Sequence, residues 1–146
     1  MSYIDENLLP DEHVVYRAAL HWIIFARTIL VLVAGLVLVF VPGAVPAGLV
    51  VLLVGAVMLV PPFVSYRTTE LGVTNKRVIV KTGLVQRRTL ELLLRQVEAI
   101  SVDQSLVGRM FGFGSITITG TGGVREIFHR VRHPLELRRR IHGQVA

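Results

Sequence analysis

The sequence predicts an α+β protein in which a two-helix transmembrane hairpin precedes a small barrel or sandwich of six to seven strands, capped by a C-terminal helix. Three observations support this fold class. Residues 28–64 carry no charged side chain, and a turn-forming cluster at 42–46 interrupts them. After Arg67 the chain changes to short runs with strand periodicity. It then ends in a segment of helical periodicity that begins near Pro134.

The apolar segment is expected to form two helices, at about 20–41 and 47–66, joined by the turn at Pro42–Pro46. A bilayer core needs only about 20 helical residues, so a single continuous helix would be too long. The first helix would span about 33 Å at its rise per residue. Ala34-Gly35 and Gly55-Ala56 lie at nearly mirrored distances from the turn. Small residues at matching depth predict close helix packing, although Ala and Gly are also simply common in membrane segments.

Two other interpretations of the apolar segment are weaker. A buried helix pair in a soluble protein would need a larger domain around it, because neither helix has the polar stripe of a surface helix. A signal peptide would need a short basic leader. The residues before this segment instead include Asp5, Glu6, Asp11 and Glu12. A membrane hairpin is therefore the preferred interpretation.

Four residues near the ends of the hairpin are predicted membrane anchors. Tryptophan and tyrosine favour the membrane interface, and an arginine one turn inside a helix can extend its side chain back to the headgroups. The predicted anchors are Trp22 and Arg27 at the first helix, and Tyr66 and Arg67 at the second.

The charge distribution predicts the topology of the hairpin. Residues 1–27 hold two basic and four acidic residues, whereas residues 65–146 hold fourteen basic and six acidic ones. The turn carries no charge. Because Lys and Arg near a membrane stay cytoplasmic, we expect an integral protein of a plasma or inner membrane with both termini cytoplasmic and the turn outside.

The segments outside the hairpin predict a cytoplasmic lead at 1–19 and a β-rich domain at 67–146. Residues 13–20 suit either a first strand or a juxtamembrane helix. The clearest alternation places Ile116 and Ile118 inside a strand at 115–119. Proline suits the first position of the last helix, on which Leu137 and Ile141 share a face. Strand-like runs lie at 68–74, 77–82, 84–94, 97–103, 115–119 and 125–131.

Five motifs stand in a distinctive order in this domain: 73–84 (VTNKRVIVKTGL), Leu90-Glu91, Val97-Glu98, 103–109 (DQSLVGR) and 112–116 (GFGSI). Together they resemble the bacterial pleckstrin-homology (PH) family of small membrane proteins. The resemblance covers about residues 8–141 and implies a PH-like fold behind a membrane hairpin. It implies no catalytic residue, since the family has no agreed chemistry.

The residue patterns favour no catalytic, metal or cofactor site. The chain contains no cysteine, which excludes disulfides and thiolate chemistry. Its glycine-rich runs at 108–114 and 120–123 lead into strands, whereas a phosphate loop opens a helix. His129 and His133 are four apart, but Pro134 disfavours a helix through His133. No carboxylates are paired at close spacing, so an enzyme is the weakest of the functions considered.

The arginines suggest a binding function. A basic domain tethered under an inner leaflet faces anionic lipid, and aromatic residues are not interleaved with these arginines as binding of nucleic acid would require. Lys76-Arg77 is similar to only part of the basic pattern of phosphoinositide-binding PH domains. The candidate anionic-lipid contacts are Arg87, Arg88, Arg95, Arg138, Arg139 and Arg140.

The predicted function is a membrane-anchored binding or scaffold module without catalysis. Its expected partners are the bilayer, anionic phospholipid, and another membrane protein or a second copy of the chain. An exposed apolar groove lined by Val107, Met110 and Phe111 would favour a protein partner. The alternative function is a regulatory subunit that controls a membrane transporter or a stress-response complex through the hairpin.

Overall fold

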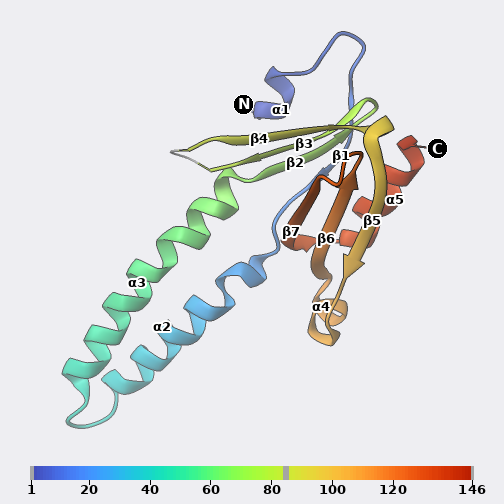
Figure 1. Cartoon of the computed structure of the whole chain (residues 1–146). Helices are drawn as coiled ribbons and strands as arrows, with labels where there is room; N and C mark the ends of the chain where they lie inside the picture. The colour runs from blue at the N-terminus through green and yellow to red at the C-terminus, as the bar shows by residue number, and fades with distance from the viewer. Residues whose placement is uncertain (1, 84–85, 146) are drawn as a thin grey trace. The chain divides into compact units, whose positions relative to one another are not determined.

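A computed structural model describes residues 2–83 and 86–145 of the chain. The chain divides into two compact units. The helical unit is Trp22–Arg67, and the β-rich unit combines Met1–His21 with Thr68–Ala146. Figure 1 shows the elements of both. The β-rich unit is therefore assembled from residues on both sides of the apolar segment, and each unit is described by itself below.

The helical unit consists of a short 3₁₀ helix, η1 (Trp22–Phe25), and two α-helices, α2 (Ala26–Val39) and α3 (Val45–Thr68). The turn between them includes Gly43, whose φ of 82° suits glycine. Trp22–Val39 and Val45–Thr68 are both long and apolar enough to cross a membrane. The two predicted helices are therefore present, with the turn displaced slightly toward the N-terminus.

Three glycines hold α2 and α3 close together. A Cβ atom at Gly35 would lie 2.9 Å from the backbone nitrogen of Leu52, and one at Gly55 would lie 2.7 Å from Cδ2 of Leu32. Gly48 faces Val39 in the same way, with 2.7 Å to its backbone nitrogen. The predicted packing role is confirmed for Gly35 and Gly55. A side chain at Gly35 would meet the backbone of α3 and push the helices apart, whereas one at Gly55 would displace the side chain of Leu32.

One side-chain contact compensates for the prolines of α3. Pro61 and Pro62 lie inside this helix. Because proline has no N–H, Pro62 leaves the carbonyl of Met58 without its helical donor. The hydroxyl of the buried Thr28 donates to that carbonyl from α2, at 3.4 Å. Thr28 therefore supplies a donor for one of the carbonyls that the prolines leave without a helical partner, in a helix that contains both prolines.

The first sheet of the β-rich unit has four antiparallel strands in the order β1-β2-β3-β4. They are β1 (Val14–Ala18), β2 (Glu70–Thr74), β3 (Arg77–Thr82) and β4 (Arg88–Leu93). β1 pairs with β2, so a strand from before the apolar segment joins strands that follow it. Residues 84 and 85, inside the predicted run 84–94, lie outside the described residues.

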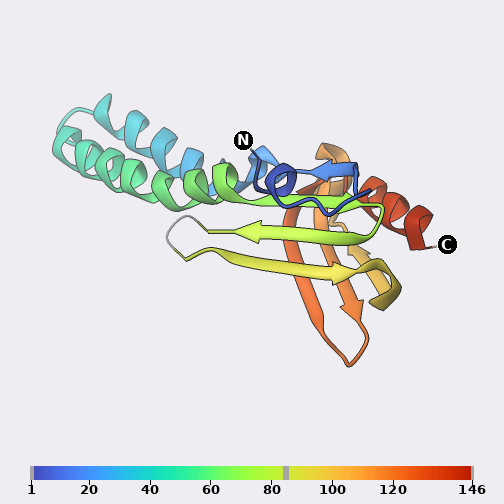
Figure 2. The same cartoon turned by 90° about the horizontal axis from the view of Figure 1, so that it is seen from above.

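The second sheet has three antiparallel strands in the order β5-β6-β7. They are β5 (Val97–Asp103), β6 (Phe113–Gly120) and β7 (Arg125–Arg132). Helix α4 (Leu106–Phe111) connects β5 to β6, and α5 (Pro134–Val145) follows β7. Helix α5 packs against β5 and β6 and also against β1 and the 3₁₀ helix η2 (Leu94–Gln96) (Figure 2).

The seven strands form two sheets rather than a closed barrel. The turn η2 separates β4 from β5, and in the described residues the two sheets share only an isolated bridge between Leu20 and Val131. A three-residue 3₁₀ turn cannot continue a strand ladder, because its backbone bonds are local. The barrel part of the prediction is thus corrected, while the antiparallel strands and the C-terminal helix are confirmed.

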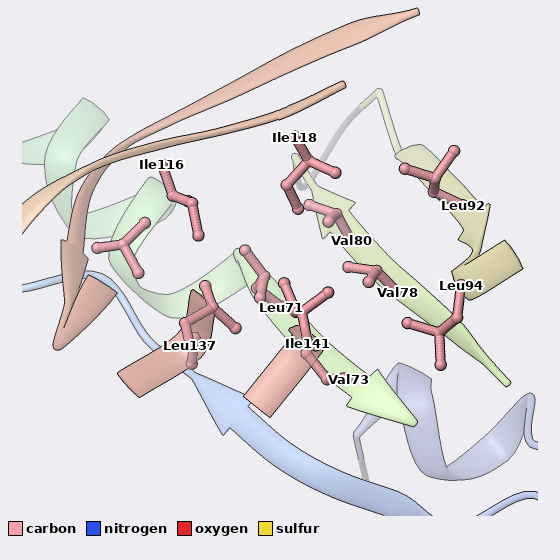
Figure 3. Packing of buried hydrophobic residues seen from close by; sticks show 12 residues of the cluster. Leu71, Val73, Val78, Val80, Leu92, Leu94, Ile116, Ile118, Leu137 and Ile141 are labelled. Atoms are coloured by element: carbon pink, nitrogen blue, oxygen red, sulfur yellow. The ribbon is translucent and has the colours of Figure 1, made fainter. Parts of the chain in front are cut away.

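The core lies between the sheets and α5. Figure 3 shows Leu137 and Ile141 of α5 among side chains from β2, β3 and β6. Both are fully buried, as are Val73 and Ile116. Ile116 and Ile118 are buried while Ser115, Thr117 and Thr119 are only half-buried, as their alternation predicts.

Candidate functional site

The loop between β2 and β3 contains Lys76 and is followed by Arg77, the first residue of β3. The guanidinium of Arg77 is buried and donates to both carboxylate oxygens of Glu12 at 3.0 Å. It also donates to Glu91 and to the backbone carbonyl of Asn7. Arg77 is therefore engaged within the fold and is not free to bind a ligand.

The residues before β1, which include Glu12 and which we call the N-terminal lead, also bind Lys76. Its ammonium donates to the carbonyl of Pro10 at 2.6 Å. The side chain of Thr74 donates to Glu12 at 2.6 Å and closes the loop from the other side. The basic pair that is similar to part of a phosphoinositide pattern thus holds the N-terminal lead in place. A head group is not expected to bind there.

Electrostatics agree with this geometry. Burial alone would raise the pKa of the Glu12 carboxyl, but hydrogen bonds from Arg77, Thr74 and the Leu9 backbone outweigh it and hold that pKa below its ordinary value. The hydrogen bond to Glu12 likewise raises the pKa of Arg77. Both groups are charged at neutral pH and hydrogen-bonded, which is the condition under which a buried pair is stable.

The candidate arginines of the first sheet do not form one patch. Arg88 begins β4 and pairs with Glu126 at 3.3 Å, and Arg87 precedes it. Arg95 lies in η2, past the opposite end of the strand. A strand of six residues is roughly 20 Å long, so Arg95 lies far from Arg87 and Arg88. A membrane surface could contact all three arginines only if it covered the whole length of β4.

Helix α5 presents the other candidate arginines together. Leu137 and Ile141 are buried, and Arg138, Arg139 and Arg140 are exposed. Glu136 accepts from Arg140 at 2.8 Å and from Arg139 at 3.4 Å. The hydrogen bond from Arg140 lowers the pKa of Glu136, so this carboxylate stays ionised. Two of these three adjacent cations thus share one acidic partner, and we call Arg138, Arg139 and Arg140 the α5 arginine face.

Helix α4 is short, capped at both ends and apolar on its outside. The Ser105 hydroxyl accepts from the backbone N–H of Gly108 at 3.0 Å, and Gly112 ends the helix in the left-handed region with φ 77°. Figure 1 shows α4 beyond the ends of β5 and β6. Four of its large apolar side chains are exposed, and we call them the α4 tip: Leu106, Val107, Met110 and Phe111.

The α4 tip contains the three predicted protein-contact residues and adds Leu106, which the sequence interpretation missed. Leu106 and Met110 are the most exposed of the four, at 78% and 80%. Their spacing of four residues places them on one side of a helix, which is the signal that could have identified Leu106. All four side chains project from one short helix.

The base of α4 is joined to the segment at which the chain leaves the β-rich unit. The backbone N–H of His133 donates to the carbonyl of Gly112 at 2.9 Å, and that of His21 donates to the carbonyl of Arg130 at 2.7 Å. The rings of His21 and Phe113 lie 5.2 Å apart. Residues 130–133 therefore bind both α4 and the exit segment, and we call this arrangement the exit joint.

Two residues of the exit joint have unusual backbone conformations. Arg130 and His133 have φ values of 55° and 49°, a region that residues other than glycine rarely adopt. Burial lowers the pKa of His21 and outweighs its hydrogen bond to the Phe111 backbone, so this histidine is neutral at pH 7. The joint thus combines two residues in the left-handed region with a buried neutral histidine, and the sequence interpretation had not identified it.

A family model described as "Bacterial PH domain" matches residues 23–145 of the chain. The chain belongs to the bacterial PH domain family. The match includes the helical unit as well as most of the β-rich unit, which we now call the PH-like domain. Searches of curated proteins and of solved structures found no match.

Membership of the family confirms the resemblance seen in the sequence and points to a binding or scaffold module, since PH domains are non-catalytic binding modules. Within the described residues, no group of three His, Asp or Glu side chains could hold a metal ion. The hydroxyl of Ser115 lies 3.1 Å from Nδ1 of His129 on the exposed surface.

The predicted anchors lie at the end of the helical unit opposite the α2–α3 turn, where α2 begins and α3 ends, and we call this the open end. Trp22 begins η1, Arg27 lies in the first turn of α2, and Tyr66 and Arg67 lie in the last turn of α3. The ring of Tyr66 lies 5.4 Å from that of Phe25, so the start of α2 and the end of α3 meet there. Two exposed arginines and a cluster of aromatic rings therefore mark the same end of the hairpin.

Proposed function

We propose that the protein is a hairpin-anchored binding module whose PH-like domain lies at the cytoplasmic face of the membrane and contacts anionic lipid. The hairpin supports the first part. Its two apolar helices have a mean hydropathy of 2.5, and only 11% of each is buried. A core helix of a soluble protein would be mostly covered, whereas lipid can cover the large apolar side chains that α2 and α3 expose.

The proposed topology follows from the charges at the two ends of the hairpin. Arg27 and Arg67 lie at the open end, and the turn between α2 and α3 is uncharged. Basic residues close to a membrane are retained on the cytoplasmic side, which puts the open end and the PH-like domain in the cytoplasm.

The single observation that carries the lipid contact is the α5 arginine face. Arg138 has no recorded ion pair among the described residues, and Arg139 and Arg140 share the one carboxylate of Glu136. Near an anionic leaflet each such cation contributes about 1 kcal/mol of attraction. Anionic phospholipid is thus a better counterpart for this face than a neutral surface.

The test uses the full chain in nanodiscs with and without phosphatidylserine. Because the natural sequence contains no cysteine, the variant His142→Cys can carry a single environment-sensitive fluorophore one helical turn after Arg138. Phosphatidylserine should shift the emission to the blue. High salt should reverse that shift, since screening shortens the range of exposed charges from about 8 Å to about 3 Å.

A pair of charge-matched variants identifies the surface. Replacing Arg138, Arg139 and Arg140 with Glu in the labelled chain should abolish the response to phosphatidylserine. Replacing Arg87, Arg88 and Arg95 with Glu changes the net charge equally and should leave it. The opposite result would assign the contact to the first sheet. If the unaltered labelled chain ignores phosphatidylserine at low salt, the lipid contact is wrong and a protein partner becomes the better hypothesis.

A further inference from the structure

The α4 tip is an apolar surface that the proposed arginine contact does not use. Soluble proteins rarely expose several large apolar side chains together without a binding role. Here Leu106, Val107, Met110 and Phe111 are all at least half exposed on a helix of six residues. Both ends of α4 are capped, by the Ser105 hydroxyl and by Gly112.

The exit joint places this tip beside the chain where it leaves the PH-like domain. Leu20 pairs with Val131, and the carbonyl of Ala19 accepts from the backbone N–H of Arg132 at 2.9 Å. His133 then connects this segment to the end of α4 through Gly112. The residue after His21 is Trp22, where the first apolar helix begins. Only contacts within the domain and one peptide bond therefore separate the base of α4 from the start of the hairpin.

We infer that the α4 tip inserts into the headgroup–acyl boundary of the bilayer that α2 and α3 cross, and that it fixes which side of the PH-like domain faces the membrane. This inference rests on the proposed membrane placement of the hairpin. Short amphipathic elements bury apolar side chains about 5–10 Å deep at that boundary while their cationic neighbours stay at the headgroups. The domain would thus have a second membrane contact besides its hairpin.

The charges around α4 favour lipid as the occupant. Arg109 and Arg139 line one groove at its base together with His133, and Arg130 lines a second groove that shares Asp103 with the first. Asp103 and Glu136 are the acidic residues of these grooves, and Glu136 is already paired with Arg139. Lipid presents phosphate groups above acyl chains, and the tip presents apolar side chains with Arg109, Arg130 and Arg139 at its base. The two surfaces are therefore complementary.

The size of the tip argues against a second copy of the chain as the occupant. A stable protein interface buries about 800 Å² on each partner and involves about 20–30 residues. The four side chains of the tip lie on a single six-residue helix and fall well short of that. A bilayer sets no such minimum, because the hairpin already holds the domain at the surface and the tip adds to an existing anchor.

The experiment compares tryptophan positions in the full chain, reconstituted in vesicles of zwitterionic lipid with bromine on the acyl chains. Trp22 is the natural tryptophan, and its quenching reports on the hairpin. In a Trp22→Phe background, Met110→Trp reports on the tip. The matched control is Val124→Trp, a similarly apolar, exposed position in the β6–β7 turn. That turn lies at the other end of β6, roughly 25 Å from α4 (Figure 2).

We expect bromine near the carbonyl end of the acyl chain to quench the Met110→Trp variant roughly twofold or more and to leave the Val124→Trp variant unaffected. Quenching of Trp22 in the unaltered chain without quenching of the Met110→Trp variant would overturn the inference and leave the hairpin intact. Absence of quenching at Trp22 as well would show that the membrane placement itself is wrong. A blue shift at position 110 that depends on protein concentration, without quenching, would assign the tip to a second copy and also overturn the inference.

Discussion

Arg77 and Arg138 have the same side chain and opposite environments. Arg77 is buried at the start of β3 and donates to Glu12, Glu91 and the Asn7 carbonyl. Arg138 is exposed on α5, and no ion pair is recorded for it among the described residues. The comparison teaches that a basic residue in a PH-like domain becomes structural when the N-terminal lead reaches it and stays available for ligands when it does not.

The N-terminal lead therefore moves the candidate ligand surface to another part of the domain. It covers the β2–β3 loop through Glu12 and Pro10, and Ile4 packs on the backbone of β2 beside Gly72, where a Cβ atom would lie 2.6 Å from Cδ1 of Ile4. The exposed cations that remain together lie on α5 and around α4. Buried and exposed charges of the domain should therefore differ in what they contribute to its stability.

The largest effect is expected from Glu12→Ala. It leaves the buried guanidinium of Arg77 without its bidentate partner, and removing one partner of a buried pair typically destabilises a protein by about 3–5 kcal/mol. Because Glu91 still contacts Arg77, we expect about 3 kcal/mol. The measurement is guanidinium unfolding of the full chain in detergent, followed by circular dichroism of the strands.

The matched control is Asp5→Ala, which breaks an exposed ion pair in the same N-terminal lead. Asp5 pairs with Arg17, and both side chains are about half exposed. Exposed pairs contribute about 0–1 kcal/mol, so this variant should unfold close to the unaltered chain. Equal losses in the two variants would mean that burial does not distinguish the two pairs, which contradicts the comparison.

The second effect concerns acid. The pKa of Glu12 is lowered in the fold, so its contribution to stability is complete above the unfolded pKa of about 4.3 and is lost as pH falls through the folded pKa. The variant Glu12→Gln should therefore be less stable at neutral pH and should lose less stability on acidification.

The acid response should be reduced in that variant but still present. Hydrogen bonds from Ser2 and two backbone amides outweigh burial and lower the pKa of Glu70, and this carboxyl is retained. Unfolding free energies measured at neutral pH and below pH 4 give the pH dependence of stability for the unaltered chain and for Glu12→Gln. An unchanged slope in Glu12→Gln would show that Glu12 gains no stabilising partner on folding.

Local sequence patterns predicted the parts of the fold that depend on nearest neighbours. The alternation around Ile116 indicated β6, and Pro134 with Leu137 and Ile141 indicated α5. The uncharged run indicated two apolar helices. Each pattern reports a period within one element, and such periods follow directly from the geometry of strands and helices.

Features that depend on distant residues were missed or left open. Arg77 shares a strand face with Ile79, which hints at burial, but its partner Glu12 lies 65 residues away in sequence. Residues 13–20 suited either a first strand or a juxtamembrane helix, and the pairing of β1 with β2 across the helical unit decides for the strand. For the candidate site, three of the four α4 tip residues were named from sequence, whereas the exit joint depends on contacts among residues 19–21, 112 and 130–133.

The smallest effect distinguishes two arginines within the α5 arginine face. Arg140 lies 5.8 Å from the ring centroid of Tyr16, whereas Arg138 has no such contact recorded among the described residues. A cation–π contact at an exposed site contributes about 0.5–1 kcal/mol. We therefore expect Arg140→Gln to destabilise the domain by about 0.5 kcal/mol more than Arg138→Gln.

In a Tyr16→Leu background that difference should disappear, which a double-mutant cycle in the same unfolding assay measures. A difference that persists without the tyrosine ring would assign it to the ion pair with Glu136, and Arg140 would then be held by charge alone.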